Sequence, residues 1–133
     1  MKILITGARG MLAREVRERF ARDDDGTKNT LVLTDLAADE DLGSKSLDIT
    51  DKEAVMELVA NEKPDVIINC AAYTNVDAAE EDAVIAEKIN AEGPKNLAEA
   101  ASKNNAVLVH ISTDYVFGGS KLTDEEYSED DKK

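Results

Sequence analysis

The sequence is poor in the residues that usually build metal and redox sites. Cys70 is the single cysteine and His110 the single histidine among 133 residues. An intramolecular disulfide is therefore excluded, and a zinc ion would lack its usual ligands. We expect no bound metal, and we interpret Cys70 as a small buried hydrophobic residue and His110 as a core or edge residue of a strand.

Long hydrophobic runs and an excess of positive charge are also missing. No apolar run approaches the roughly 20 residues that cross a bilayer, and the run that begins the chain is too short for a signal peptide. Only 16 lysines and arginines face 29 aspartates and glutamates, so the formal net charge of −13 repels phosphate backbones. We expect a cytoplasmic protein with no membrane and no nucleic-acid partner.

What the sequence does contain is an alternation of strand and helix patterns. Short apolar runs predict five strands, at residues 2–6, 30–35, 45–50, 65–70 and 106–112. Alternating strands and helices favour an α/β fold, here a doubly wound parallel sheet of the Rossmann type with strand order 3-2-1-4-5. We assign residues 1–121 to this nucleotide-binding domain and residues 122–133 to a poorly ordered acidic tail.

The segments between the strands show helical spacing. After the first strand, apolar residues recur every four positions. A second helix is expected to be capped by Asp51 and to end before Pro64. A third is expected to begin at Asp77 and to be interrupted near Gly93 and Pro94, after which a fourth helix follows.

A glycine turn follows the first strand. In GARGMLA, Gly7, Gly10 and Ala13 are three residues apart. Glycine permits a tight turn and close approach of a pyrophosphate to the N–H groups at a helix start, while Ala13 lets helix and strand pack closely. A plain strand-to-helix turn needs only one glycine, so the pattern favours a dinucleotide site.

Asp35 closes the second strand, where ligands of such folds bind. A carboxylate there accepts hydrogen bonds from an adenosine ribose and repels a 2′-phosphate, which favours NAD(H). Arg9 argues for NADP(H), because a guanidinium in the glycine turn can bind that phosphate. The alternative for Asp35 is a helix cap or loop carboxylate without a ligand.

Two further segments end strands at the same edge of the sheet. Asp48 and Ile49 would flank an adenine, or be only a strand terminus and a core residue. Ala71 and Ala72 leave room for a cofactor against the fourth strand, and Tyr73 offers a donor beyond it. The alternative for this segment is a plain strand-to-helix loop.

The fifth strand ends in hydroxyl groups. Ser112, Thr113, Asp114 and Tyr115 leave it beside the position expected for a nicotinamide. A hydroxyl there can donate to a substrate carbonyl and stabilise the charge that develops during reduction. Asn90, in the helical region, is interpreted as an exposed helix residue rather than a positioning group.

Taken together, five stretches resemble the extended short-chain dehydrogenase/reductase family over residues 1–121: ILITGARGMLA, LTD, LDITD, INCAAYTNVD and HISTDYVFGG. The resemblance implies hydride transfer from NAD(P)H to a dTDP-linked 4-keto-6-deoxy sugar. By motif match it implies a pyrophosphate along Gly10, Met11 and Leu12, ribose at Asp35, adenine at Asp48 and Ile49, nicotinamide near Ala71, Ala72 and Tyr73, a catalytic hydroxyl at Thr113, and the sugar at Asp114 and Tyr115.

One element of the family pattern is missing. The family's proton donor is a tyrosine followed four residues later by a lysine, but the three tyrosines here are followed at that spacing by Asp77, Gly119 and Asp131. We therefore expect the front part of a longer enzyme, inactive alone. The alternatives are a non-catalytic nucleotide-binding regulatory subunit or a sugar-nucleotide epimerase of the same family.

Without a following helix, one face of the fourth and fifth strands is expected to lack cover. Exposed apolar surface of this kind invites self-association. A homodimer that buries this face is the expected assembly.

Overall fold

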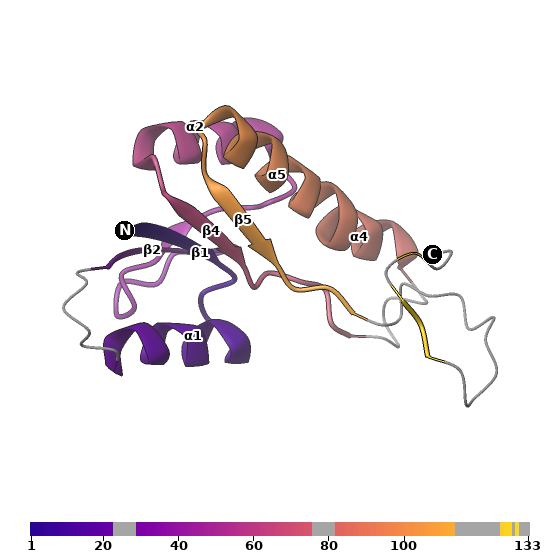
Figure 1. Ribbon diagram of the computed structural model, residues 1–133, viewed down its shortest axis with the longest axis horizontal. Helices are drawn as coiled ribbons and strands as arrows, with labels where there is room; N and C mark the ends of the chain where they lie inside the picture. Colours follow the sequence, from indigo (N-terminus) through magenta and orange to yellow (C-terminus); the bar gives the residue numbers. More distant parts are fainter. Residues whose placement is uncertain (23–28, 76–81, 114–125, 129, 131–133) are drawn as a thin grey trace.

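The computed structural model describes residues 1–22, 29–75, 82–113, 126–128 and 130, in which strands and helices alternate (Figure 1). The elements are β1 (Lys2–Thr6), α1 (Met11–Arg22), β2 (Thr30–Asp35), β3 (Lys45–Ser46), α2 (Lys52–Glu62), β4 (Val66–Asn69), α4 (Ala83–Glu87), the π-helical turn η1 (Lys88–Glu92), α5 (Gly93–Lys103) and β5 (Val107–His110). The domain boundary predicted at residue 121 lies outside the described residues.

The five strands form one parallel sheet in the order β3-β2-β1-β4-β5. This confirms the predicted fold class and strand order. The central strand β1 is buried over its last four residues, as expected for a strand covered on both faces. Thr6 pairs with Asn69, and Asn69 with His110, so the carboxyl ends of β1, β4 and β5 lie side by side.

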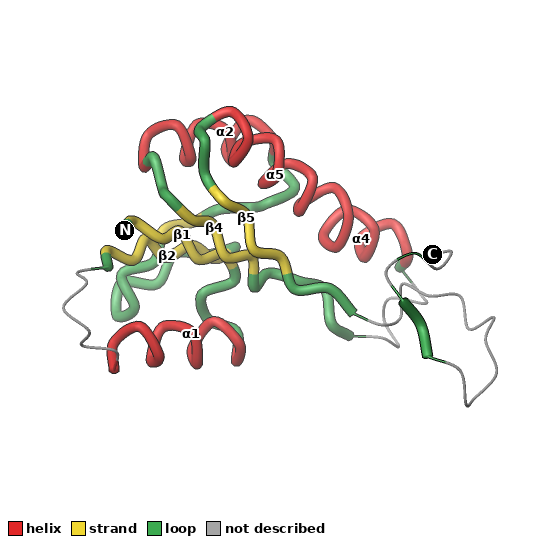
Figure 2. The backbone as a smooth tube through the Cα atoms, in the orientation of Figure 1, coloured by secondary structure: helices red, strands yellow, loops and turns green. Residues whose placement is uncertain are grey.

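Helices cover the two faces of the sheet unequally (Figures 1 and 2). α2 and α5 lie on one face, over a core of nine buried residues around Ile67 and Leu97. α1 lies on the other face, where three residues, Ile3, Ile5 and Ala13, are fully buried. The first face is therefore the better packed of the two.

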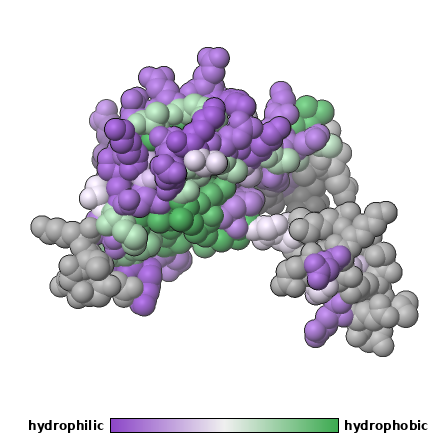
Figure 3. Space-filling model, turned by 45° about the horizontal axis from the view of Figure 1, so that its top comes forward, coloured by the Kyte–Doolittle hydropathy of each residue, from purple (hydrophilic) through white to green (hydrophobic). Residues whose placement is uncertain are grey.

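Strand β5 leaves an apolar strip exposed. Val107, Val109 and Ile111 are alternate residues with exposed fractions of 60%, 41% and 53%. On β4, by contrast, Val66 and Ile68 pack into the α1 layer, so the exposed face predicted for both strands is confined to the β5 segment. Figure 3 shows hydrophobic side chains gathered near the centre of one face of an otherwise largely hydrophilic surface.

The helix α2 has the predicted limits. Asp51 is its N-cap, and its carboxylate accepts the N–H of Ala54 at 3.0 Å. The helix ends at Glu62, after which Lys63 takes a left-handed conformation with φ of 48°. The chain thus leaves the helix before Pro64.

The third strand is shorter than predicted. β3 ends at Ser46, although the N–H of Leu47 still donates to Asp35 O at 2.7 Å. Beyond it, the Asp48 carboxylate accepts from the N–H and hydroxyl of Thr50 at 2.9 and 2.8 Å. This local turn replaces further strand pairing.

The interruption predicted near Gly93 and Pro94 is a π-helical turn rather than a break in the chain of helices. α4 ends at Glu87, η1 spans Lys88–Glu92, and α5 begins at Gly93 without a gap. The Gly93 N–H donates to Lys88 O, five residues back, which makes the turn π-helical. Pro94 is near the start of α5. Because proline has no N–H, it cannot continue the α-helical hydrogen bonds of the preceding turn, in agreement with a π-helical turn at this point. A Cβ on Gly93 would lie 2.5 Å from Cδ1 of Ile49, so glycine allows close packing here.

Candidate functional site

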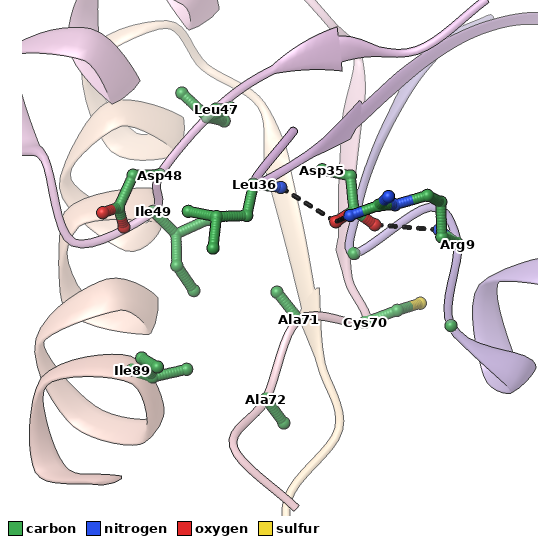
Figure 4. A pocket seen from close by; sticks show the side chains of 12 residues that line it. Arg9, Asp35, Leu36, Leu47, Asp48, Ile49, Cys70, Ala71, Ala72 and Ile89 are labelled. Atoms are coloured by element: carbon green, nitrogen blue, oxygen red, sulfur yellow. Dashed lines mark hydrogen bonds and ion pairs between the residues drawn. The ribbon is translucent and has the colours of Figure 1, made fainter. Parts of the chain in front are cut away.

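A pocket of about 470 Å³ opens at the carboxyl ends of β1, β2 and β4, the edge at which a ligand is predicted. Figure 4 shows its walls, which come from four strand ends and from η1. Eight residues proposed for the cofactor line it: Gly7, Arg9, Gly10, Asp35, Asp48, Ile49, Ala71 and Ala72. So do four that no cofactor motif singled out: Leu36, Leu47, Cys70 and Ile89.

The turn between β1 and α1 brings two backbone segments into close contact. Gly7 has a φ of 64°, and the Gly10 N–H donates to its carbonyl at 3.0 Å. A Cβ on Gly7 would lie 2.7 Å from the main-chain nitrogen of Ala71. Glycine is therefore required by both conformation and space. Ala13 is fully buried, in agreement with close helix–strand packing.

Asp35 and Arg9 bind each other in the pocket wall (Figure 4). Asp35 Oδ2 accepts the Arg9 N–H at 2.9 Å, and Oδ1 accepts from the guanidinium at 3.1 Å and from the Leu36 N–H at 2.9 Å. Partial burial acts to raise the pKa of Asp35, but the hydrogen bonds from Arg9 and Leu36 outweigh it and hold the pKa below the ordinary 3.8. The carboxylate is charged at neutral pH, and both its oxygens already accept hydrogen bonds.

The two side chains of this pair differ in accessibility. The Arg9 side chain is 48% exposed and that of Asp35 is 14% exposed. A long, solvated guanidinium can leave the pair at little cost, whereas the carboxylate keeps its main-chain donors. An incoming ligand therefore meets a movable cation and a fixed anion.

One part of the pocket is apolar. Leu36 and Ile89 line it together with Ile49, which is 5% exposed and belongs to the core beneath α2 and α5. Ile49 is thus a core residue that also reaches the pocket. Neighbouring Asp48 lines the pocket while its carboxylate holds Thr50. An apolar wall with a carboxylate beside it suits a flat ring with polar edges.

The segment after β4 is held by Asn90 of η1. Asn90 Oδ1 accepts the Tyr73 N–H at 2.8 Å, and its Nδ2 donates to Tyr73 O at 3.0 Å. Asn90 is exposed, as the preferred interpretation expects, and these two bonds also give it the positioning role that was the alternative. Its amide fixes the backbone next to Ala71 and Ala72, whose small side chains line the pocket.

The remaining predicted residues lie away from the pocket wall or outside the described residues. Met11 and Leu12, in the first turn of α1, are 81% and 43% exposed and do not line the pocket. Nor do Tyr73 and the exposed Thr113. The positions predicted to face the sugar, Asp114 and Tyr115, lie outside the residues that the structure describes.

Cys70 lines the pocket and packs against the α1-side core. Burial raises the pKa of its thiol, so the thiolate is disfavoured at neutral pH. This agrees with its interpretation as a small hydrophobic residue.

The described part of the chain shows neither a metal-binding cluster nor a membrane-spanning helix. There, no group of three or more histidine, cysteine, aspartate or glutamate side chains is placed to hold a metal ion. No helix within that part has the length and apolar character to cross a membrane.

Comparison with known proteins gives a consistent family. The family model described as RmlD substrate binding domain matches residues 1–133. The dTDP-4-dehydrorhamnose reductase of Mycolicibacterium smegmatis is 48% identical over 117 residues, which are 88% of this chain and 32% of that protein. The chain therefore spans about a third of this relative's length.

Solved structures resemble this chain in the same way. A dTDP-4-dehydrorhamnose reductase from Clostridium acetobutylicum has 46% identity and a TM-score of 0.81, covering 99% of this chain and 42% of its own. The Bacillus anthracis enzyme in complex with NADP has 38% identity and a TM-score of 0.75, and the match covers 90% of this chain and 39% of that enzyme. A Thermus thermophilus UDP-glucose 4-epimerase in complex with NAD has 26% identity and a TM-score of 0.76, and the match covers 97% of this chain and 43% of the epimerase.

Proposed function

The chain belongs to the family described as RmlD substrate binding domain, and we propose that it supplies the cofactor-binding front part of a dTDP-4-dehydrorhamnose reductase. The reaction reduces the 4-keto group of dTDP-4-dehydrorhamnose and yields dTDP-L-rhamnose. The observation that carries the proposal is the pocket itself. A left-handed glycine, a carboxylate at the end of β2 and two alanines after β4 meet there.

The residues of this pocket fit a dinucleotide. The close Gly7–Ala71 contact keeps side chains out of the space beside the start of α1, and the first turn of a helix presents N–H groups that the helix itself does not use. The proposed pyrophosphate site is the turn Gly10–Met11–Leu12, where Met11 and Leu12 offer such N–H groups. The Gly10 N–H already donates to Gly7 O, so Gly10 is proposed to contribute the space left by its missing side chain. Exposure of the Met11 and Leu12 side chains does not affect a role that main-chain atoms perform.

The other proposed contacts divide the pocket between the two halves of the cofactor. Asp35 is proposed to accept from the adenosine ribose, and the apolar wall at Ile49, beside Asp48, to hold the adenine. Ala71 and Ala72, with the backbone of Tyr73 fixed by Asn90, are proposed to bound the nicotinamide half.

The proposed chemistry assigns different tasks to cofactor and chain. NAD(P)H supplies the hydride when bound. The Thr113 hydroxyl is proposed to donate to the ketone oxygen and stabilise its developing charge, and Asp114 and Tyr115 to contact the sugar. No tyrosine here has a lysine four residues later, so we propose that this chain alone does not complete protonation and does not turn over.

The cofactor preference follows from the Arg9–Asp35 pair. We favour NAD(H), because the Asp35 carboxylate keeps two main-chain donors and remains charged, and a fixed anion repels a 2′-phosphate. NADP(H) would require the Arg9 guanidinium to leave Asp35 and bind the phosphate. Both cofactors occur among similar structures, NADP in the Bacillus anthracis enzyme and NAD in the Thermus thermophilus epimerase.

The reductase is favoured over the two alternatives by similarity. Identity is 38–46% to the two reductase structures above and 26% to the epimerase. A regulatory subunit needs a dinucleotide site without reduction, and no observation on this chain favours it. The pocket alone is compatible with all three, so substrate turnover by the longer protein separates them.

For assembly, we propose a homodimer in which two copies cover each other's β5. The apolar strip of Val107, Val109 and Ile111 belongs to a segment, residues 104–113, that contains no charged residue in a chain that is 34% charged. Edge strands that remain single are usually protected by charge. Sedimentation velocity is expected to show a dimer that Val109→Lys converts to monomer; a monomeric wild-type chain contradicts it.

Calorimetric titration with NADH and NADPH tests the cofactor site. We expect weak, saturable NADH binding that Asp35→Ala reduces. Arg9→Ala is expected to weaken NADPH binding more than NADH binding. Asp41→Ala, an exposed loop carboxylate outside the pocket, is the matched control and is expected to bind as the wild type does.

Two outcomes would contradict the proposal. Failure of a demonstrably folded chain to bind either cofactor would remove the dinucleotide site from this chain. Measurable reduction of dTDP-4-dehydrorhamnose by residues 1–133 would refute the proposed inactivity.

A further inference from the structure

A buried asparagine connects the three strand ends that lead to the proposed site. Asn69, at the end of β4, and Thr6, at the end of β1, are each 1% exposed. The Thr6 hydroxyl donates to Asn69 Oδ1 at 2.5 Å, and the Ala71 N–H donates to the same oxygen at 3.1 Å. Asn69 Nδ2 lies 3.0 Å from Nδ1 of His110, at the end of β5. We call this set of four residues the Asn69 junction.

The Ala71 contact fixes the direction of these bonds. A main-chain N–H only donates, so the Asn69 atom that it meets is the oxygen, and the opposite atom of the amide is the nitrogen. Because Asn69 Nδ2 has only donors to offer, His110 Nδ1 must accept and therefore carries no proton. A neutral His110 then has its proton on Nε2.

Each strand held by the junction continues into a segment of the proposed site. Thr6 precedes Gly7, and Ala71 is the residue whose main chain a Gly7 Cβ would strike. His110 precedes the Ser112–Thr113 hydroxyls on the chain. The junction therefore joins the proposed pyrophosphate turn, the nicotinamide wall and the strand that carries the proposed reactive hydroxyl.

We infer that Asn69 is a positioning residue that sets these three segments relative to one another and selects the Nε2–H tautomer of His110. This inference rests on the proposed function for its consequence in catalysis, but the junction itself is testable without any ligand. Asn69 touches neither cofactor nor substrate in this role. It acts through Ala71 and His110.

The first test is heteronuclear NMR of the imidazole ring nitrogens in the wild-type chain. His110 is the only histidine, so the ring signals need no assignment. At about pH 8, where an ordinary imidazole is neutral, we expect the proton on Nε2 and a hydrogen-bonded, unprotonated Nδ1. A ring protonated at Nδ1, or one averaging between both tautomers, would overturn the inference without any variant being needed.

The second test reverses the donor. Asn69→Asp keeps the acceptor for Thr6 and Ala71 but replaces the donor toward His110 with an acceptor, so the proton is expected to move to Nδ1. A residue that only fills space would not reverse a tautomer. Asn96→Asp is the control, because Asn96 is also buried and its Nδ2 donates to Ile49 O at 3.0 Å, in another part of the core. An unchanged tautomer in folded Asn69→Asp would refute the inference.

The third test reads the consequence for the site. Asn69→Ala removes the acceptor of the Ala71 N–H, whose hydrogen exchange is expected to accelerate at least about tenfold while the amides of α2 keep their protection. In a chain that binds NADH, the same variant is expected to weaken binding about tenfold. Absent wild-type binding would count against the proposed function alone, whereas unchanged Ala71 exchange would count against the junction.

Discussion

The two faces of the sheet differ in how many residues the helices bury on them. On the α2/α5 face, nine buried residues form a core, and seven partly buried hydrophobic residues pack around it. On the α1 face, the partly buried hydrophobic residues are also seven, but only three residues are buried. The first face stabilises the domain, and the second carries the glycine turn and the Arg9–Asp35 pair. The pocket lies where the two meet, which places proposed ligand contacts next to the less buried layer.

The difference follows from the number of helices that cover each face. α2 and α5 pack against each other, α5 contacts β4 and β5, and the core beneath the two helices includes Leu4 of β1 and Ile67 of β4. The single helix α1 packs with residues of β1, β2 and β4. Polar turns that approach a ligand cannot also be fully buried. Four predictions test this contrast.

Truncation in the α2/α5 core is expected to have the largest effect. Leu97→Ala removes a side chain with 0% exposure and is expected to cost about 2–5 kcal/mol of unfolding free energy. Val109→Ala, on the 41% exposed strip, is expected to cost less than about 1 kcal/mol. Urea unfolding of dilute protein measures both, and equal losses would contradict the contrast.

A smaller, localised effect is expected in the glycine turn. Gly7→Ala forces a Cβ into a left-handed conformation, at about 1–2 kcal/mol, and brings it 2.7 Å from Ala71 N. Hydrogen exchange is expected to rise in α1 while α5 keeps its protection. Gly43→Ala is a useful control, since Gly43 also has a positive φ of 68° but no atom near its Cβ position. An equal loss of hydrogen-exchange protection in α1 and α5 would contradict the contrast between the two faces.

Asp35 is expected to make a pH-dependent contribution to the free energy of unfolding. Because its pKa in the folded chain lies below the ordinary value, the carboxylate stabilises the fold above about pH 4 and loses this contribution as pH falls through the lowered pKa. Asp35→Asn should therefore cost about 1 kcal/mol or less at neutral pH, and the difference from wild type should vanish in acid. Thermal unfolding between about pH 3 and 7 checks this, and a difference that grows in acid would reverse the assigned sign.

The smallest effect is expected on the outer surface of α1. Arg22 binds Glu18 at 2.6 Å, but the two side chains are 68% and 44% exposed. Arg22→Ala is expected to change stability by less than about 0.5 kcal/mol, and less still at high salt. A loss comparable to that of Leu97→Ala would show that surface charge, rather than packing, holds this layer.

The elements predicted correctly from sequence depend on local chemistry. The tight turn at Gly7 is recognisable because few residues other than glycine tolerate its conformation, and the position of Asp35 at the end of β2 because it closes a β-branched run. The strand order follows from alternating elements and right-handed crossovers. Asp51 is recognisable as a helix cap because its carboxylate precedes a helical pattern.

The elements missed depend on distant neighbours. Asn90 binds Tyr73, 17 residues away, only because a π-helical turn places its amide there. Asn69 contacts residues 63 and 41 positions away, on two other strands. Neither contact leaves a periodic signal in the sequence. Glycine and proline at 93 and 94 predicted an interruption of the helix, but not that it would be a π-helical turn.

That turn has a consequence for how the molecule tolerates changes in length. An α-helix rotates about 100° per residue, and η1 contains the extra residue that a π-helical turn accommodates. Deleting one residue within 88–92 would restore an unbroken α-helix, with α5 still anchored through Leu97, Ala100 and Ala101. The part of the helix that precedes the deletion would then be rotated about the helix axis by roughly 100° relative to α5. If Asn90 itself is kept, its side-chain amide would no longer point at the backbone of Tyr73. A shorter and more regular helix would therefore no longer hold the segment that follows β4.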